Sequence, residues 1–139
     1  GGTVSVPCFS SLASGTSGEA SPESFLSLDP QFGGREGSFF VRARASELGV
    51  LGVGEGDLVL ISPVELKEAE DGAVIVIGFG DSASFFRLSK SGSSFSLEDL
   101  KPGGGTTVSE QSALTGLVGR VAGFYRKMDG VGSLNLTPH

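Results

Sequence analysis

The stretch GAVIVIGFGDSASFFRLSKSGSSFSLEDL (residues 72–100) decides the fold, because it contains three consecutive strand patterns joined by short turns. Residues 72–80 hold a continuous Val/Ile run, which indicates a strand buried on both faces. Residues 82–90 and 94–100 flank the turn SGSS and therefore predict a hairpin. Short strands with tight connections are typical of an all-β domain.

Similar short apolar segments lie on both sides of this stretch. The further strands that we expect cover residues 3–7, 25–28, 38–45, 57–62 and 116–128. Residues 9–23 are small and polar, which favours a flexible loop. We therefore predict one small, curled, partly closed β domain over residues 3–128, followed by a ragged tail at 129–139. Residues 1–2, both glycine, have the composition of an expression-vector remnant.

The composition limits the class of protein. The chain has 139 residues, enough for one domain with a core, and 38% of them are hydrophobic. Its formal charge of −6 and its scattered basic residues argue against direct contact with nucleic acid, because phosphate binding needs clustered Lys and Arg. No apolar run approaches the ~20 residues that span a membrane, and no secretory segment opens the chain. We therefore expect a cytoplasmic protein without membrane contact.

Few kinds of chemistry are compatible with the residue types. His139 is the single histidine and Cys8 the single cysteine, so we expect no metal site and no Ser/His/Asp triad. The glycines at 103–105 lack the lysine of a phosphate-binding loop, so we expect no cofactor. A serine nucleophile with a lysine base remains open, because burial can lower the pKa of a lysine.

Five segments share their order and spacing with one family. VP at 6–7 with LASG at 12–15 is similar to the entry into that family's cleavage loop. The other segments cover residues 29–42, 42–57, 71–88 and 117–128, and are similar to its DP…F…FLLR stretch, its R-V-x-G-x-S-M-x-x-x-G-I-x-D-G-D segment, its N-G-x-V-V-V…V-K-R-L hairpin and its closing strand. Together they resemble the C-terminal domain of LexA-type and lambda-type repressors, the self-cleaving serine/lysine peptidase fold shared with UmuD.

The chain departs from this family at the residues that cut. Aligned without gaps, the nucleophilic serine falls on Glu47 and the general-base lysine on Phe86, while the scissile Ala-Gly pair falls on Ser14–Gly15. A carboxylate is a weak nucleophile, and phenylalanine cannot take up a proton. The resemblance therefore implies a scaffold that does not cleave itself and is not an enzyme.

An alternative keeps the peptidase active. Ser46, one residue before the aligned position, would become the nucleophile in a shifted loop and would cut at Ser14–Gly15. Its base is then missing, because Lys90 lies four residues beyond Phe86. Both residues also have purely structural interpretations. Ser46 would cap a helix or a turn. Phe86 would fill the core.

In the resembled family, this domain dimerises a repressor whose separate N-terminal head binds DNA. The resemblance implies a homodimeric regulatory domain of a phage- or prophage-type transcriptional repressor. Without self-cleavage, induction would need a protein partner such as an antirepressor. Apolar residues of the last strand are the interface candidates, unless this strand is an ordinary buried one: Leu117, Val118, Val121, Phe124 and Tyr125.

A further alternative is a binding module. In that interpretation, the vestigial peptidase cleft holds a peptide or a small ligand, and the loop at 9–23 acts as its lid.

Overall fold

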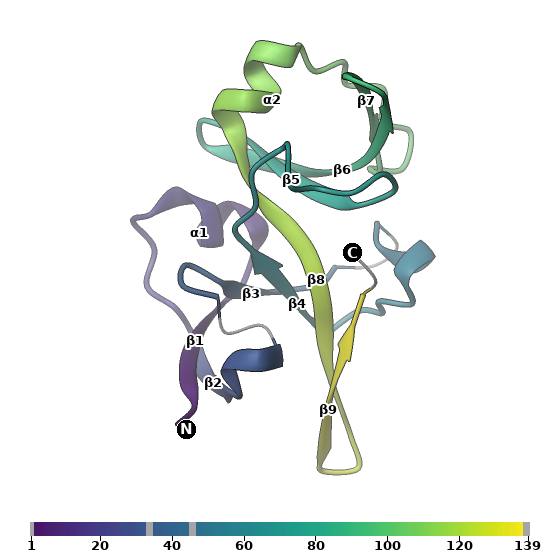
Figure 1. Ribbon diagram of the computed structural model, residues 1–139. Helices are drawn as coiled ribbons and strands as arrows, with labels where there is room; N and C mark the ends of the chain where they lie inside the picture. Colours follow the sequence, from purple (N-terminus) through teal and green to yellow (C-terminus); the bar gives the residue numbers. More distant parts are fainter. Residues whose placement is uncertain (1, 33–34, 45–46, 138–139) are drawn as a thin grey trace.

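The computed structural model describes residues 2–32, 35–44 and 47–137, so that Gly1 of the expected vector remnant lies outside it. Strands dominate the described part of the chain and confirm the predicted mainly-β class (Figure 1). The strands are β1 (Val4–Phe9), β2 (Ser24–Leu28), β3 (Phe39–Arg42), β4 (Leu58–Ser62), β5 (Val74–Phe79), β6 (Ser82–Ser91), β7 (Ser94–Asp99), β8 (Leu117–Met128) and β9 (Val131–Leu136). The helices are α1 (Leu12–Ser17) and α2 (Glu110–Gly116), with 3-10 turns at Pro30–Phe32 and Gly49–Leu51.

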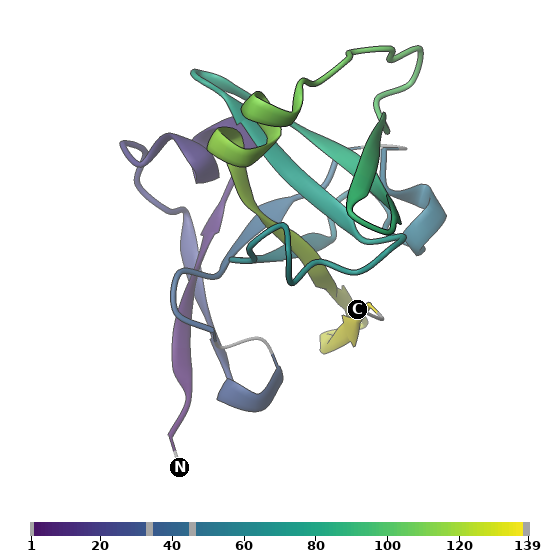
Figure 2. The same ribbon diagram turned by 45° about the horizontal axis from the view of Figure 1, so that its top comes forward.

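All these strands belong to one sheet that is not closed into a barrel. Its order is β2-β1-β3-β4-β8-β5-β6-β7, and β9 pairs with β8 beside this path. Every neighbouring pair is antiparallel except β1 and β3, which run parallel. The long strand β8 joins the two ends of the molecule: β5, β6, β7 and α2 at one end and β1, β2 and β3 at the other (Figures 1 and 2).

The hairpin of β5 and β6 separates two hydrophobic clusters, because neighbouring side chains of a strand point to opposite faces. Val74, Val76 and Phe85 lie in a first cluster with residues of β3, β4 and β8. Ile75 and Phe86 lie in a second cluster, which α2 covers with Ala113. Burial of such a side chain stabilises the fold by about 1.5–3 kcal/mol. A third cluster, around Phe40 and Leu60, joins side chains of β1 and β2 to those of β3, β4 and β8.

Two expectations for irregular segments were wrong. The expected loop at 9–23 contains α1, which begins where the Ser11 side chain accepts a hydrogen bond from the Ser14 amide and ends at Gly18 in the left-handed region. The expected tail at 129–139 contains β9, which returns along β8. Asp129 and Gly130 form the turn with φ of 51° and 80°, a conformation that the Asp-Gly pair favours.

The helix α2 was also unpredicted, because residues 101–112 have the composition of a loop. Ser109 caps it by accepting a hydrogen bond from the Ser112 amide. In the part of the chain that the structure describes, no helix has the length and apolar character needed to cross a membrane.

Candidate functional site

A small pocket lies where the start of α1 meets β3, β4, β6 and the loop after β3. Its volume is about 80 Å³. The lining residues are Ser11, Leu12, Val41, Arg42, Ala43, Arg44, Glu47, Leu48, Val59 and Phe85. Glu47, at the aligned nucleophile position, thus lies beside the segment that resembles the cleavage loop. We call this cavity the Glu47 pocket.

The aligned scissile pair, Ser14–Gly15, lies within α1 and not in an extended segment. The Gly15 amide donates to the Ser11 carbonyl at 3.0 Å, so this peptide bond is part of a helical turn. A Cβ on Gly15 would lie 2.7 Å from Cε2 of Phe39, which shows how closely α1 packs on β3. The helix also contacts β6. The segment that resembles the cleavage loop is therefore folded against the sheet beside the Glu47 pocket.

Phe86, at the aligned position of the general base, does not line the Glu47 pocket. Phe86 is completely buried in the second cluster and makes an edge contact with Phe79, with ring centroids 6.1 Å apart. Its neighbour Phe85 points to the other face of β6 and lines the Glu47 pocket. The alternation of faces along a strand separates these two phenylalanines, and an ungapped alignment does not resolve which face a residue occupies. Phe86 is therefore a core residue, in agreement with the interpretation that it fills the core.

No lysine lines the Glu47 pocket among the described residues. Lys90, four residues beyond Phe86, directs its ammonium group to the turn before β5, where Nζ donates to the carbonyls of Ala69 at 2.6 Å and Leu66 at 3.0 Å. Ser46 and His139 lie outside the described residues. Within those residues, no cluster of His, Cys, Asp and Glu has the arrangement of a metal site.

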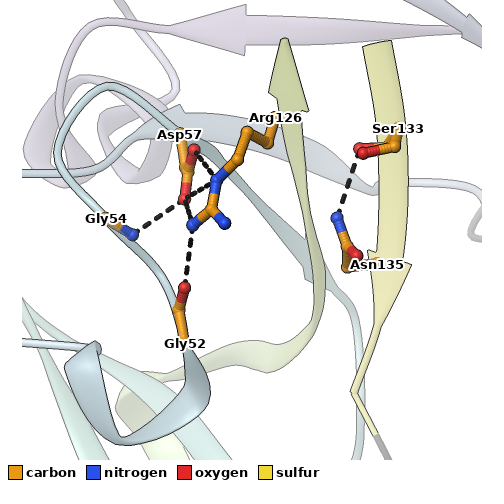
Figure 3. A network of polar contacts seen from close by, with 6 residues as sticks. All are labelled: Gly52, Gly54, Asp57, Arg126, Ser133 and Asn135. Atoms are coloured by element: carbon orange, nitrogen blue, oxygen red, sulfur yellow. Dashed lines mark hydrogen bonds and ion pairs between the residues drawn. The ribbon is translucent and has the colours of Figure 1, made fainter. Parts of the chain in front are cut away.

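Sequence reasoning missed an ion pair that fixes the loop after β3. Arg126 of β8 donates from Nε to Oδ1 of Asp57 at 2.9 Å and from Nη2 to Oδ2 at 2.6 Å (Figure 3). The same Nη2 donates to the Gly52 carbonyl at 2.8 Å, and the Gly54 amide donates to Oδ2 of Asp57 at 2.8 Å. Beyond the ion pair, Asn135 of β9 donates to the Ser133 carbonyl. The loop that contains Glu47 and the strand β8 are thereby joined.

Burial and hydrogen bonding make this ion pair a strong local constraint. The Asp57 side chain is 7% exposed, whereas that of Arg126 is 37% exposed. The hydrogen bond from Arg126 lowers the pKa of Asp57, and the same bond raises the pKa of Arg126. The guanidinium carbon also lies 5.1 Å from the centre of the Phe124 ring. The sequence holds no local signal for this ion pair, because 69 positions separate its two residues.

Of the five interface candidates of β8, two are buried and three are partly buried. Val121 and Phe124 are buried in the first cluster. Val118 is partly buried against that cluster, Leu117 against the second cluster and Tyr125 against the third. Val121 and Phe124 are therefore core residues of one copy of the chain.

Two exposed apolar side chains lie opposite each other at the end of the hairpin of β8 and β9. Met128 is 65% exposed and Val131 is 70% exposed, and the two residues are paired in the register of the strands. Large apolar side chains that protrude near one another often mark a contact surface. We call Met128 and Val131 the hairpin surface.

The chain matches no protein-family model and no curated protein. Its function is therefore inferred from the geometry of the site.

Proposed function

We propose that this chain is the dimerisation and regulatory domain of a LexA-type, phage- or prophage-type transcriptional repressor, and that it does not cleave itself. The observation on which this rests is the Glu47 pocket, where a carboxylate and the Phe85 ring lie beside the segment that resembles a cleavage loop. A carboxylate is a weak nucleophile and a phenylalanine ring cannot accept a proton, so the two groups do not form the nucleophile–base pair of the resembled peptidases. The open mainly-β sheet and the order of the five resembling segments support the same family.

The helical geometry of Ser14–Gly15 supports the absence of cleavage independently. Its amide hydrogen is already engaged with Ser11, and the helix packs on the Phe39 ring. Cutting this bond would first require α1 to unwind and leave β3.

The volume of the Glu47 pocket argues against the binding-module alternative. Ligand pockets usually measure about 300–1,000 Å³, whereas this one measures about 80 Å³. A peptide or drug-sized ligand would have to displace α1 to enter it.

Dimerisation is the role that needs no catalysis, and the hairpin surface is our candidate for it. Among the described strands, β9 pairs with β8 alone, so its outer edge offers backbone donors and acceptors to another strand. In a twofold dimer the same surface of both copies would meet. Without self-cleavage, a partner protein such as an antirepressor would separate the copies by competing for this surface.

Cleavage is tested by the intact mass after long incubation at alkaline pH, which deprotonates a catalytic lysine. We expect an unchanged mass, because no lysine lines the described part of the Glu47 pocket. Loss of residues 1–14 would contradict the proposal. Abolition of that cut in Ser46→Ala would then assign the reaction to Ser46.

Dimerisation is tested by sedimentation equilibrium over a range of protein concentrations. We expect a monomer–dimer equilibrium that Val131→Asp weakens at least about tenfold, because a charge would enter an apolar contact. Leu114→Asp is the matched control, since Leu114 is 56% exposed on α2, at the other end of β8 from the hairpin surface. A monomer at every concentration, or equal effects of the two variants, would refute this surface.

A further inference from the structure

A second groove, of about 290 Å³, lies on the sheet away from the Glu47 pocket. Two arginines reach it from different parts of the chain, Arg35 before β3 and Arg120 on β8. Ser62 at the end of β4 forms part of its floor, next to Arg120 in the register of β4 and β8. Phe32 and Leu136 contribute an apolar wall. We call this cavity the arginine groove.

The charge in the arginine groove is opposite to that of the whole chain. The chain has 16 acidic and 10 basic residues, yet no carboxylate is among the lining residues that the structure describes. In the described part of the chain, Arg120 makes no ion pair. Arg35 has one, a 3.7 Å contact with Glu68 between side chains that are 56% and 42% exposed. Such an exposed contact contributes little and can be exchanged for another anion.

A buried hydroxyl adds a neutral donor to the two guanidinium groups. The Oγ atoms of Ser62 and Ser38 are 3.0 Å apart, and both residues are buried. Each hydroxyl has one hydrogen, so one hydrogen of the pair remains after the bond between them is made. When Ser38 donates to Ser62, the Ser62 hydroxyl is free to donate into the groove.

The apolar wall of the groove indicates which kind of anion it would bind. Phe32 is 48% exposed and Leu136 is 51% exposed, and both lie beside the cationic groups. Guanidinium groups bind carboxylate and phosphate in the same two-bonded geometry. Inorganic phosphate would leave the apolar wall in contact with water, whereas an organic acid would cover it.

We propose that the arginine groove binds a carboxylate attached to a small apolar group, with Arg35 and Arg120 on the carboxylate and Phe32 and Leu136 on the apolar part. The volume is at the lower limit of ligand pockets and suits one amino-acid-sized group. Such a group is found at the C-terminal residue of a peptide and in a free aromatic acid. This site does not depend on the repressor role.

The test is a titration of the full chain followed by amide chemical shifts in two-dimensional NMR. The probes are N-acetyl-L-phenylalanine, which mimics a peptide C-terminus, and phenylacetate, which represents a free acid. We expect saturable shifts at the amides of Ser62 and Ala122 with at least one of them, and the tighter probe identifies the source. Arg120→Gln and Arg35→Gln should each weaken binding about tenfold, since each removes a charged hydrogen-bond donor.

Matched controls separate recognition of the carboxylate from a general charge effect. Arg87→Gln removes an arginine of β6 that does not line the arginine groove, and should leave the affinity unchanged. N-acetyl-L-phenylalaninamide, which lacks the carboxylate, should not bind. Equal binding of this amide, equal binding of inorganic phosphate, or unchanged affinity in both groove variants would overturn the proposal. If Arg120→Gln fails to fold, Arg35→Gln decides, because Arg35 is an exposed residue.

Discussion

Replacing Phe86 with lysine will unfold the domain, whereas the same replacement at Phe85 will leave it folded with reduced stability. Phe86 has no exposed surface and lies in the second cluster, so Phe86→Lys removes a packed ring and buries an ammonium group without a partner. Loss of a buried phenylalanine alone costs about 3–5 kcal/mol. A stable domain of this size has only about 5–15 kcal/mol in total.

Phe85 differs because it lines the Glu47 pocket, where a lysine could extend its charge toward water. Urea unfolding of both variants, followed by circular dichroism, measures the difference. Phe86→Leu is the control for packing, since it remains apolar and should stay folded. Equal stability of the two lysine variants would contradict this expectation, because it would mean that a lysine at position 85 does not reach water through the Glu47 pocket.

The second large effect is expected for Asp57→Asn, which should lower the free energy of unfolding by about 2–4 kcal/mol at pH 7. The substitution removes the charge that Arg126 binds with three short contacts while leaving the side-chain volume nearly unchanged. Asp81→Asn is the matched control, because Asp81 is exposed in the turn between β5 and β6 and should change stability little.

The effect of Asp57→Asn should also depend on pH. Because the hydrogen bond from Arg126 depresses the pKa of Asp57 in the folded protein, the stabilisation is fully present above the unfolded value of about 3.9 and is lost as the pH falls through the folded value. The gap between the original chain and Asp57→Asn should therefore shrink below about pH 4. Urea titrations at pH 7 and near pH 3 measure this gap, and a constant gap would mean that the ion pair contributes nothing.

The strands with clear apolar patterns were predictable, because burial of one or both faces fixes the spacing of Val, Ile and Phe. The Val/Ile run of β5 is such a case: Ile75 and Val76 are both completely buried, on opposite faces. β9 was missed because its residues are mostly exposed and its pairing comes from β8. The Asp129–Gly130 turn was the available signal, since Asp-Gly pairs favour tight hairpins.

The candidate site was predictable only in part. The sequence did not indicate whether the segment at 9–23 packs near Glu47, and in the structure Ser11 and Leu12 line one pocket with Glu47. The phenylalanine that shares the pocket with Glu47 was not predictable from the sequence. Phe85 and Phe86 are identical residues, and they differ only in the face of β6 to which they point. The bond between Asp57 and Arg126 joins residues far apart in the chain, and no local pattern encodes such a contact.

The central place of β8 in the sheet has a consequence for synthesis. β4 and β5 both pair with β8, which follows them in the chain after β6, β7 and α2. At about 5–20 residues per second, the ribosome exposes β4 for several seconds before β8 emerges. During that interval the apolar edges of β4 and β5 lack their shared partner, a situation that favours aggregation. Folding of this domain is therefore expected to be slow, to complete only after β8 has emerged, and to benefit from chaperones that cover nascent strands.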